Sequence, residues 1–368
     1  MIEINGKILC DGCFKELDKE SECSCGFSGN YANSLQSGTI VNGRFIVGKQ
    51  VRESDTVKEY LCYDPQKSDT VLIKEFFPKM LVSRNGDNSV QIKDADDLTA
   101  YNSLMQRFIE LMQIPQRLSS DCFIKVENAF YENNTAYFVI KNHSQLTVRE
   151  YIESGKKTSD KQAVLSLSLA VKGLCELKEN GFVNSKISDR NVYIDDDSIV
   201  ADVFETDQYD LAHYMKESVA FGKTSFYMSA YDFAKKEKDI SSDIFSFGAV
   251  LYTMLTAKQP QSPFKAEAQF DKTALENSTS EKRLVKIIEK MCRIDGQKYE
   301  SLSSLVKDIN RLSRRYGFEK IKISSALEET NKTKNNGKTI KIVITLLFVI
   351  LVVAAGFIFA DNCRFSEM

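Results

Sequence analysis

The stretch T-V-L-I-K-E-F-F at residues 70–77 decides the fold of this chain. Its β-branched and aromatic residues are typical of a strand. Similar short runs lie at 44–48 and 60–63 before it and at 136–140 after it. Between them, residues 98–113 place apolar side chains at helical spacing. The first half of the chain is therefore predicted to be mostly strand, with one helix.

The second half has a helical pattern. After about residue 146, apolar residues fall at i, i+3, i+4 and i+7, at Leu167, Ala170, Val171 and Leu174. Further apolar helices are predicted at 243–255, 284–291 and 302–312. A β-rich half followed by an α-rich half predicts an α+β protein of two lobes with a cleft between them.

Composition limits the possible classes of function. The 368 residues are 43% apolar, enough for one full-sized domain with accessories. The net charge of −2 offers no electrostatic reason to expect a nucleic-acid partner. Residues 1–7 lack the basic start and apolar run of a signal peptide. Four scattered cysteines in apolar contexts predict reduced, buried thiols in a cytosolic body: Cys62, Cys122, Cys175 and Cys292.

Four stretches, taken in order, resemble motifs of the bacterial Ser/Thr protein kinases of the eukaryotic-like type. S-G-T-I-V-N-G-R-F-I-V-G (37–48) resembles the G-T-x-L-x-G-R-Y-x-I-G opening, and I-K-E-F-F-P (73–78) resembles A-I-K-E-F-F-P. D-I-F-S-F-G (243–248) resembles D-V-Y-S-L-G, and K-Y-E-S (298–301) resembles R-Y-x-S. The resemblance implies a two-lobed protein kinase-like fold over residues 39–316, with the N-lobe ending near 142.

The resemblance also implies roles for individual residues. Lys74 matches the strand lysine that grips the α- and β-phosphates of ATP, and Asn191 and Asp202 match the two metal ligands. The alternatives are a solvated strand lysine, a loop asparagine bonded to its own backbone and an ordinary strand-end aspartate. Glu110 is the candidate helix partner of Lys74, although the family spacing points nearer Leu111.

The expected catalytic loop has lost its base. N-S-K-I-S-D-R-N (184–191) stands where the family carries H-R-D-x-x-x-x-N. Lys186 occupies the place of the catalytic aspartate, and an ammonium group cannot accept the substrate proton. Asp189 lies too close to Asn191 in sequence to replace that aspartate. No catalytic residue is therefore predicted.

The expected phosphate loop is lost as well. Residues 51–60 read V-R-E-S-D-T-V-K-E-Y where the family has L-G-x-G-G-F-G-x-V-Y, so no glycine remains to let the backbone approach the phosphates. The acids Glu53, Asp55 and Glu59 would repel phosphate. At 229–231, S-A-Y replaces A-P-E, and its glutamate is missing. Binding of ATP and Mg²⁺ is possible through the retained residues but doubtful.

A separate cysteine module is expected within residues 1–30. Cys10 and Cys13 form a C-x-x-C pair, and Cys23 and Cys25 form a C-x-C pair. Their arrangement resembles the small zinc ribbon found before such kinases, in which four thiolates hold a structural zinc ion. The second pair is one residue shorter than usual. The alternative is four reduced thiols without a metal.

The apolar run at 342–360 contains no charge and no proline and predicts a transmembrane helix. The less favoured alternative is a buried core helix. Residues 317–341 form a polar linker that carries Lys332, Lys334, Lys338 and Lys341, and 361–368 form a short tail. By the positive-inside rule we expect a single-pass protein of the cell membrane, with its body in the cytoplasm and its tail outside.

Together these features predict a membrane-tethered pseudokinase that acts as a signalling scaffold or regulatory binding module. Its partners would be cytoplasmic or membrane proteins, and modification of residues 206–227 could switch it. The alternative is a divergent, weakly active Ser/Thr kinase that transfers phosphate from ATP by means of Lys74, Asn191 and Asp202. A third possibility is a subunit of a larger membrane complex.

Overall fold

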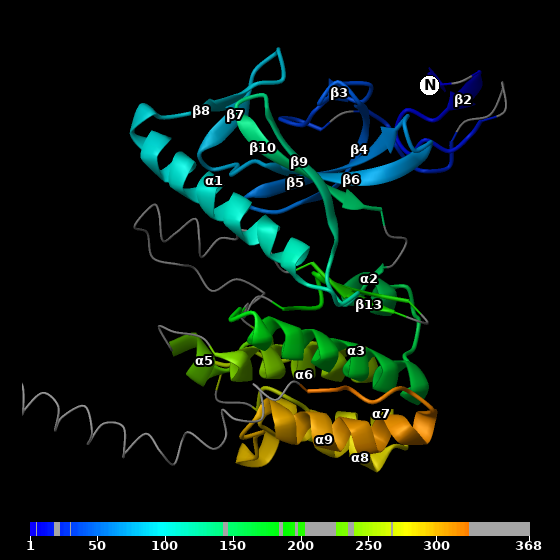
Figure 1. Ribbon diagram of the computed structural model, residues 1–368, viewed down its shortest axis with the longest axis vertical. Coiled ribbons are helices and arrows are strands. Elements are labelled where there is room, and N and C mark those ends of the chain that lie inside the picture. Colours follow the sequence, from blue (N-terminus) through cyan, green and yellow to red (C-terminus); the bar gives the residue numbers. More distant parts are fainter. Residues whose placement is uncertain are drawn as a thin grey trace, which may run out of the picture.

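The chain folds into two lobes, one built on a sheet and one on helices (Figure 1). The computed structural model describes residues 1–4, 6–17, 23–29, 31–142, 146–183, 187–195, 198–202, 226–234, 239–265 and 268–323. The predicted two-lobed α+β fold is confirmed.

The N-lobe is an antiparallel sheet of six strands. Their order is β3 (Ile40–Val41), β4 (Phe45–Glu53), β5 (Val57–Asp64), β6 (Asp69–Phe76), β10 (Thr135–Lys141) and β9 (Val126–Glu132). The predicted strand at 70–77 is the central β6, which pairs with β5 and β10. Two small hairpins accompany the sheet, β1 (Ile2–Ile4) with β2 (Lys7–Leu9) and β7 (Val82–Arg84) with β8 (Val90–Ile92).

Helix α1 (Leu98–Gln113) covers one face of this sheet, over the residues that the sequence predicted. Its fully buried Phe108 lies between two aromatic rings of the sheet. The ring centroid of Phe108 is 5.4 Å from that of Phe76 and 5.4 Å from that of Phe138. Side chains at even positions of β6, Leu72 among them, face this core, and Lys74 follows on the same side of the strand.

The cysteine segment packs against strands β4 and β5 of the sheet, where the ring of Phe14 lies 5.6 Å from that of Tyr63. The backbone N–H of Lys49 on β4 donates to the carbonyl oxygen of Gly12 at 2.9 Å. A Cβ atom on Gly48 would lie 2.6 Å from the same carbonyl oxygen and 2.8 Å from that of Leu61, so only glycine permits this approach. Ser37 adds a bond from its hydroxyl to the carbonyl oxygen of Asp11 at 2.6 Å. The segment is therefore packed directly against the N-lobe.

A buried polar network holds the connector 31–38 to the face of the sheet opposite α1. The carboxylate of Glu75 is fully buried and accepts hydrogen bonds from Tyr60 at 2.9 Å and Tyr137 at 2.7 Å. Arg84 pairs with the same carboxylate and also donates to the carbonyl oxygen of Asn33 at 3.1 Å. Because every buried polar group has a partner here, the face is specified by hydrogen bonds as well as by packing.

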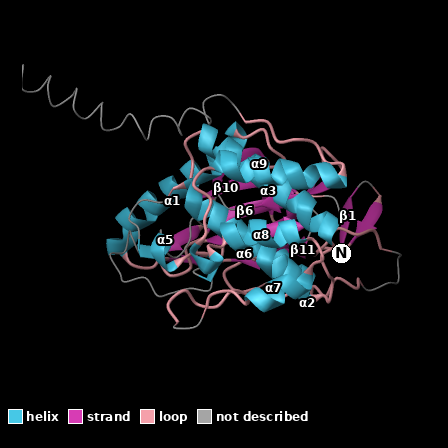
Figure 2. Cartoon of the chain, turned by 90° about the horizontal axis from the view of Figure 1, so that it is seen from below, coloured by secondary structure: helices cyan, strands magenta, loops and turns pink. Residues whose placement is uncertain are grey.

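The C-lobe is helical, with a small sheet on the side toward the N-lobe (Figure 1). The sheet consists of β11 (Leu146–Thr147), β12 (Val192–Ile194) and β13 (Ile199–Ala201). The helices are α2 (Val148–Glu153), α3 (Asp160–Glu179), α5 (Ala230–Ala234), α6 (Ile240–Thr256), α7 (Lys272–Ser278), α8 (Lys282–Met291) and α9 (Leu302–Ser313). Helix α6 is buried over most of its length and contacts α3, α7 and α8. Seen from below, α7, α8 and α9 lie across the end of the C-lobe that is farther from the N-lobe (Figure 2).

Short 3-10 segments link several of these elements: η1 (Ala95–Asp97), η2 (Ile114–Arg117), η4 (Ile294–Gly296) and η5 (Arg314–Tyr316). Among the described residues, no helix combines the length and apolar character needed to cross a bilayer. The run at 342–360, most of the predicted linker and the tail lie outside those residues, and the predicted transmembrane helix stays a prediction.

The α1 core yields a first prediction. Replacing Phe108 by Ala should lower the free energy of unfolding by about 3–5 kcal/mol, because the ring is fully buried and its loss leaves a cavity. Leu98→Ala, at an exposed position of the same helix, is the matched control and should cost under about 1 kcal/mol. Urea denaturation followed by circular dichroism measures both. Equal losses would contradict the placement of α1.

Candidate nucleotide site and cysteine cluster

The hairpin between β4 and β5 occupies the position expected of the phosphate loop. Its turn is short, since the N–H of Ser54 donates to the carbonyl oxygen of Val57 at 2.8 Å. Arg52 and Glu59 are direct cross-strand partners in this hairpin, and Nη2 of Arg52 lies 3.3 Å from Oε2 of Glu59. Opposite charges on facing residues stabilise an antiparallel pair. Charged side chains thus occupy positions at which the kinase family carries glycines.

Lys74 and Asp202 meet beside this hairpin. Lys74 is on β6, next to β5, and Asp202 directly follows β13 of the C-lobe. The Lys74 ammonium donates to Oδ2 of Asp202, and it lies 3.8 Å from Oε2 of Glu59. Arg52 reaches the same oxygen of Asp202 at 3.3 Å. We call Arg52, Glu59, Lys74 and Asp202 the charge cluster.

The charge cluster is closed to solvent. The side chains of Lys74 and Asp202 have no exposed surface, Glu59 has 5% and Arg52 has 27%. Burial lowers the pKa of Lys74, and the carboxylate of Asp202 opposes that shift. Two cations thus face two carboxylates, so that each buried charge has a partner without any ligand. The groups expected to bind phosphate and metal are engaged with one another.

Asn191 stands next to Asp202 but is turned into its own loop. Its backbone carbonyl oxygen accepts from the N–H of Asp202 at 2.8 Å. Its side-chain oxygen accepts from the N–H of Ser188 at 2.8 Å, a local bond of the type common in loops. Lys186, at the expected position of the base, lies outside the described residues.

Asp189 has a structural role. Its carboxylate is 2% exposed and accepts from Nε of Arg149 at 2.8 Å and from Nε2 of Gln259 at 3.1 Å. Its backbone oxygen accepts from the N–H of Arg149 at 2.9 Å. A carboxylate held by a guanidinium inside the lobe is not presented to a substrate hydroxyl, in agreement with the expectation from its spacing.

The expected pairing of Glu110 with Lys74 is not present. The Glu110 side chain is 53% exposed, accepts from Gln106 at 3.2 Å and lies 3.8 Å from Arg107. Lys74 instead contacts Asp202 and Glu59. Glu110 is on the solvent side of α1, since the inner side carries the apolar residues that pack on the sheet.

The carboxylate expected to be missing near 229–231 is supplied one residue later. Asp232 is fully buried, and one of its oxygens lies 2.8 Å from Nη1 of Arg293. It also accepts from the hydroxyls of Ser229 at 2.5 Å and Ser242 at 3.0 Å. Sequence reasoning missed this pair because Arg293 is 61 residues away in the chain. The one sequence feature that pointed to this pair was an acidic residue, Asp232, next to the position where the family carries its glutamate.

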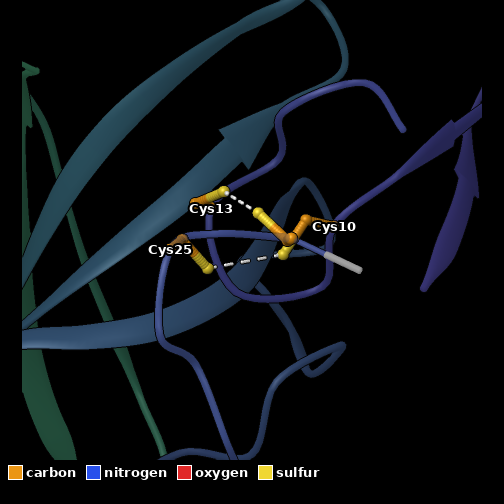
Figure 3. Close-up of side chains that lie close together, drawn as sticks. Cys10, Cys13 and Cys25 are labelled. Carbon is orange, nitrogen blue, oxygen red and sulfur yellow. Dashed lines mark hydrogen bonds between the residues drawn. The ribbon is translucent and has the colours of Figure 1, made fainter. Parts of the chain in front are cut away.

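The cysteine module brings four sulfur atoms together. The Sγ atoms of Cys10, Cys13, Cys23 and Cys25 all lie within 4.8 Å of one another. Cys10 and Cys25 are 3.6 Å apart, and Cys13 and Cys23 are 3.4 Å apart. Figure 3 shows Cys10, Cys13 and Cys25 with their sulfur atoms turned toward a common centre. The short C-x-C pair therefore does not keep its sulfurs from the other two.

The geometry of this cluster fits a tetrahedral metal. Zinc–sulfur bonds of about 2.3 Å place the sulfurs of a tetrahedral site about 3.8 Å apart, close to the separations here. The N–H of Gly12 donates to the sulfur of Cys10 at 3.4 Å. Burial, together with the neighbouring thiols, raises the pKa of Cys13 to about 12, so its thiol keeps its proton unless a cation offsets the charge. The cluster could hold zinc.

Comparison with known proteins agrees with the fold. Residues 79–316 match the family model described as the protein kinase domain, so this chain belongs to the protein kinase domain family. The matched stretch begins after Lys74 and the glycine-free hairpin.

One curated protein and one solved structure are similar to this chain. A probable serine/threonine-protein kinase of Clostridium acetobutylicum is 21% identical over 228 residues, which are 61% of this chain and 31% of that protein. The chain thus aligns with about a third of that relative's length. The solved structure of PpkA-294 in its apo form superposes with a TM-score of 0.66 at 19% identity, covering 76% of this chain and all of that one. This likeness supports the fold.

The charge cluster predicts an unusual response to mutation. Asp202→Asn should cost about 3–5 kcal/mol of unfolding free energy, because it removes the carboxylate that both Arg52 and Lys74 contact. Lys74→Met/Asp202→Leu removes both partners and should recover most of that loss. Glu127→Gln, in a surface pair with Lys67 at 2.7 Å, is the control and should cost at most about 1 kcal/mol.

Urea denaturation of these variants without nucleotide measures the four values. If Asp202→Asn proves as mild as the surface control, Asp202 is open to solvent and available to a metal, and the closed arrangement is wrong.

Proposed function

We propose that this chain is a pseudokinase that acts as a regulatory binding module or signalling scaffold at a membrane. The observation that carries the proposal is the charge cluster, in which Lys74 and Asp202 bind each other with no exposed surface. Arg52 covers them from the hairpin, where glycines would be needed for a phosphate to approach. A nucleotide would have to break these ion pairs before it could bind.

The chemistry of the catalytic loop supports the same proposal. Lys186 stands at the position of the base in the sequence, and Asp189 is occupied by Arg149. Loss of a general base alone costs roughly 10²–10⁴-fold in rate. Loss of the glycine loop removes the positioning of the phosphates, on which phosphoryl transfer chiefly depends. Together the two losses favour a binding function over catalysis.

The two accessory segments support a tethered scaffold. In the proposal, the four-cysteine cluster holds a structural zinc, with four thiolates and no open position for a substrate. Its backbone contact with Lys49 fixes it to the N-lobe, so that sheet and ribbon offer one rigid surface to a protein partner. The apolar run at 342–360 anchors the chain in the cell membrane with this body in the cytoplasm.

The competing proposal is a divergent Ser/Thr kinase of low activity. It is favoured by the contact of Lys74 with Asp202 and by the backbone bond from Asp202 to Asn191, which keep these three residues together. In that case ATP with Mg²⁺ would have to displace Arg52 from Asp202. The two proposals differ in whether the native protein binds nucleotide.

Nucleotide binding is tested by the melting temperature of the purified chain with and without millimolar ATP and Mg²⁺ or Mn²⁺. We expect no shift for the native chain, since a ligand stabilises only as RT ln(1 + [L]/Kd) and the site is filled by side chains. Arg52→Gly/Glu59→Val removes the covering pair and should create a metal-dependent shift. Lys186→Asp added to that variant should then restore measurable phosphotransfer.

The control is Lys74→Ala in the opened variant, which should abolish the shift again. A metal-dependent shift in the native chain, lost in Lys74→Ala, would favour the kinase proposal instead.

The zinc proposal has its own test. Elemental analysis of the chain purified without added metal should find about one zinc per chain, and Cys25→Ser should abolish it. Removal of the metal by a chelator should lower the melting temperature, because binding free energy at such a site is folding free energy. Cys62→Ser, at a buried cysteine outside the cluster, is the control and should keep its zinc. Full folding stability without zinc would contradict a structural role.

A further inference from the structure

Helices α8 and α9 lie at the end of the C-lobe farthest from the N-terminus (Figure 1), and each carries a row of cations. On α8, Arg283, Lys286 and Lys290 follow one another at i, i+3 and i+7, which places them on one side of the helix. On α9 and its continuation into η5, three more occur at i, i+4 and i+7, namely Lys307, Arg311 and Arg314. The inner sides of both helices are apolar and packed in the core.

Two adjoining grooves connect these rows. One has a volume of 630 Å³ and runs between α8 and α9, and the other has a volume of 530 Å³ and lies between α9 and the segment at 320–323. Both are lined by Arg311 and Arg314. Asp308 is the single carboxylate in either lining. We call the cations that line them the cationic face: Arg283, Lys286, Lys290, Lys307, Arg311, Arg314, Arg315 and Lys320.

Most of the charge on this face is not neutralised. Asp308 lies 3.4 Å from Arg311 and 3.9 Å from Lys290, and Glu281 pairs with Arg315 at 2.8 Å. Within the described part of the chain, no ion pair involves the four other helical cations of the face: Arg283, Lys286, Lys307 and Arg314. All four are exposed. The protein as a whole has a net charge of −2, so this face is a local concentration of positive charge.

We infer that the cationic face docks on the anionic phospholipid headgroups of the bilayer into which the chain is anchored. The inference rests on the proposed membrane anchor. The described domain ends at 323, beside these grooves, and the apolar run begins at 342. The connecting stretch, even fully extended, reaches only about 60 Å. The tether therefore keeps the cationic face close to the membrane, whose cytoplasmic leaflet carries negative charge.

The form of the face favours a lipid surface over other anions. Its charges are exposed and spread over two helices, whereas a site for one phosphate group gathers several donors around a single point. The chain's own linker is a poor occupant, because residues 324–341 contain four lysines and two glutamates and would be repelled. An extended anionic surface matches both the spread and the sign of the charge.

Docking in this way would orient the molecule. Figure 1 places α8 and α9 at the opposite end from the N-lobe and the cysteine segment. With the cationic face on the membrane, the N-lobe and its ribbon would point into the cytoplasm, toward the protein partners of the proposed function.

The test uses the full chain in lipid nanodiscs of phosphatidylcholine, with or without phosphatidylglycerol. A water-soluble acylating reagent labels exposed lysines, and mass spectrometry reports Lys286 and Lys307, with Lys67 on the N-lobe as reference. We expect labelling of Lys286 and Lys307, relative to Lys67, to fall about fivefold in the anionic discs. The protection should vanish in 1 M salt, where the screening length is about 3 Å.

A matched pair of triple variants isolates the face. Arg283→Gln/Arg311→Gln/Arg314→Gln keeps both reporter lysines and should lose the protection. Lys79→Gln/Lys93→Gln/Arg117→Gln removes as many charges from exposed positions around the N-lobe and should keep it.

Three outcomes would overturn the inference. Equal labelling in both kinds of disc, with the chain inserted, would mean that the domain does not dock, and the proposed anchor would stand. Protection by a soluble phosphoserine peptide in neutral discs, with none from anionic lipid, would assign the face to a phosphorylated partner. Failure of the chain to purify with either disc would remove the membrane anchor and this inference together.

Discussion

The ion pair between Lys74 and Asp202 is the interaction that closes the candidate nucleotide site. It joins the central strand of the N-lobe to the end of β13 in the C-lobe, and both side chains are wholly buried. A buried charge is tolerated only when it is paired. In a kinase that binds nucleotide, these residues are reserved for phosphate and metal. Here Arg52 and Glu59 add one positive and one negative charge. The four side chains together are therefore neutral, and the site is closed without a ligand.

The charge cluster follows from the loss of glycine in the hairpin between β4 and β5. Glycines would leave space over Lys74, whereas Arg52 and Glu59 are cross-strand partners that direct long charged side chains into it. Charged residues in place of those glycines thus remove the phosphate loop. They also supply ion-pair partners for Lys74 and Asp202. The family match begins at residue 79, after these two strands.

The rest of the molecule is arranged around this closed centre. At one end, the cysteine segment is held on the sheet because the backbone of Gly12 lies close against the backbone of Gly48 and Lys49. At the other end, α8 and α9 turn their apolar sides inward and leave their cations outside. A domain with the cysteine segment at one end and the cationic face at the other suits the proposed protein that binds on two sides.

The sequence by itself determined the order of the elements, the span of α1 and the two-lobed α+β fold, because strand and helix periodicity and local motifs are properties of neighbouring residues. Through resemblance to a family, it also identified Lys74 and Asp202 as candidate residues of one nucleotide site. Only the tertiary structure decided which side chains contact these residues. Glu59 replaces Glu110, and Asp232 pairs with Arg293, because such contacts depend on which face of an element points inward and on strands that meet across the fold. The closure of the site is likewise a property of packing, which spacing along the chain does not reveal.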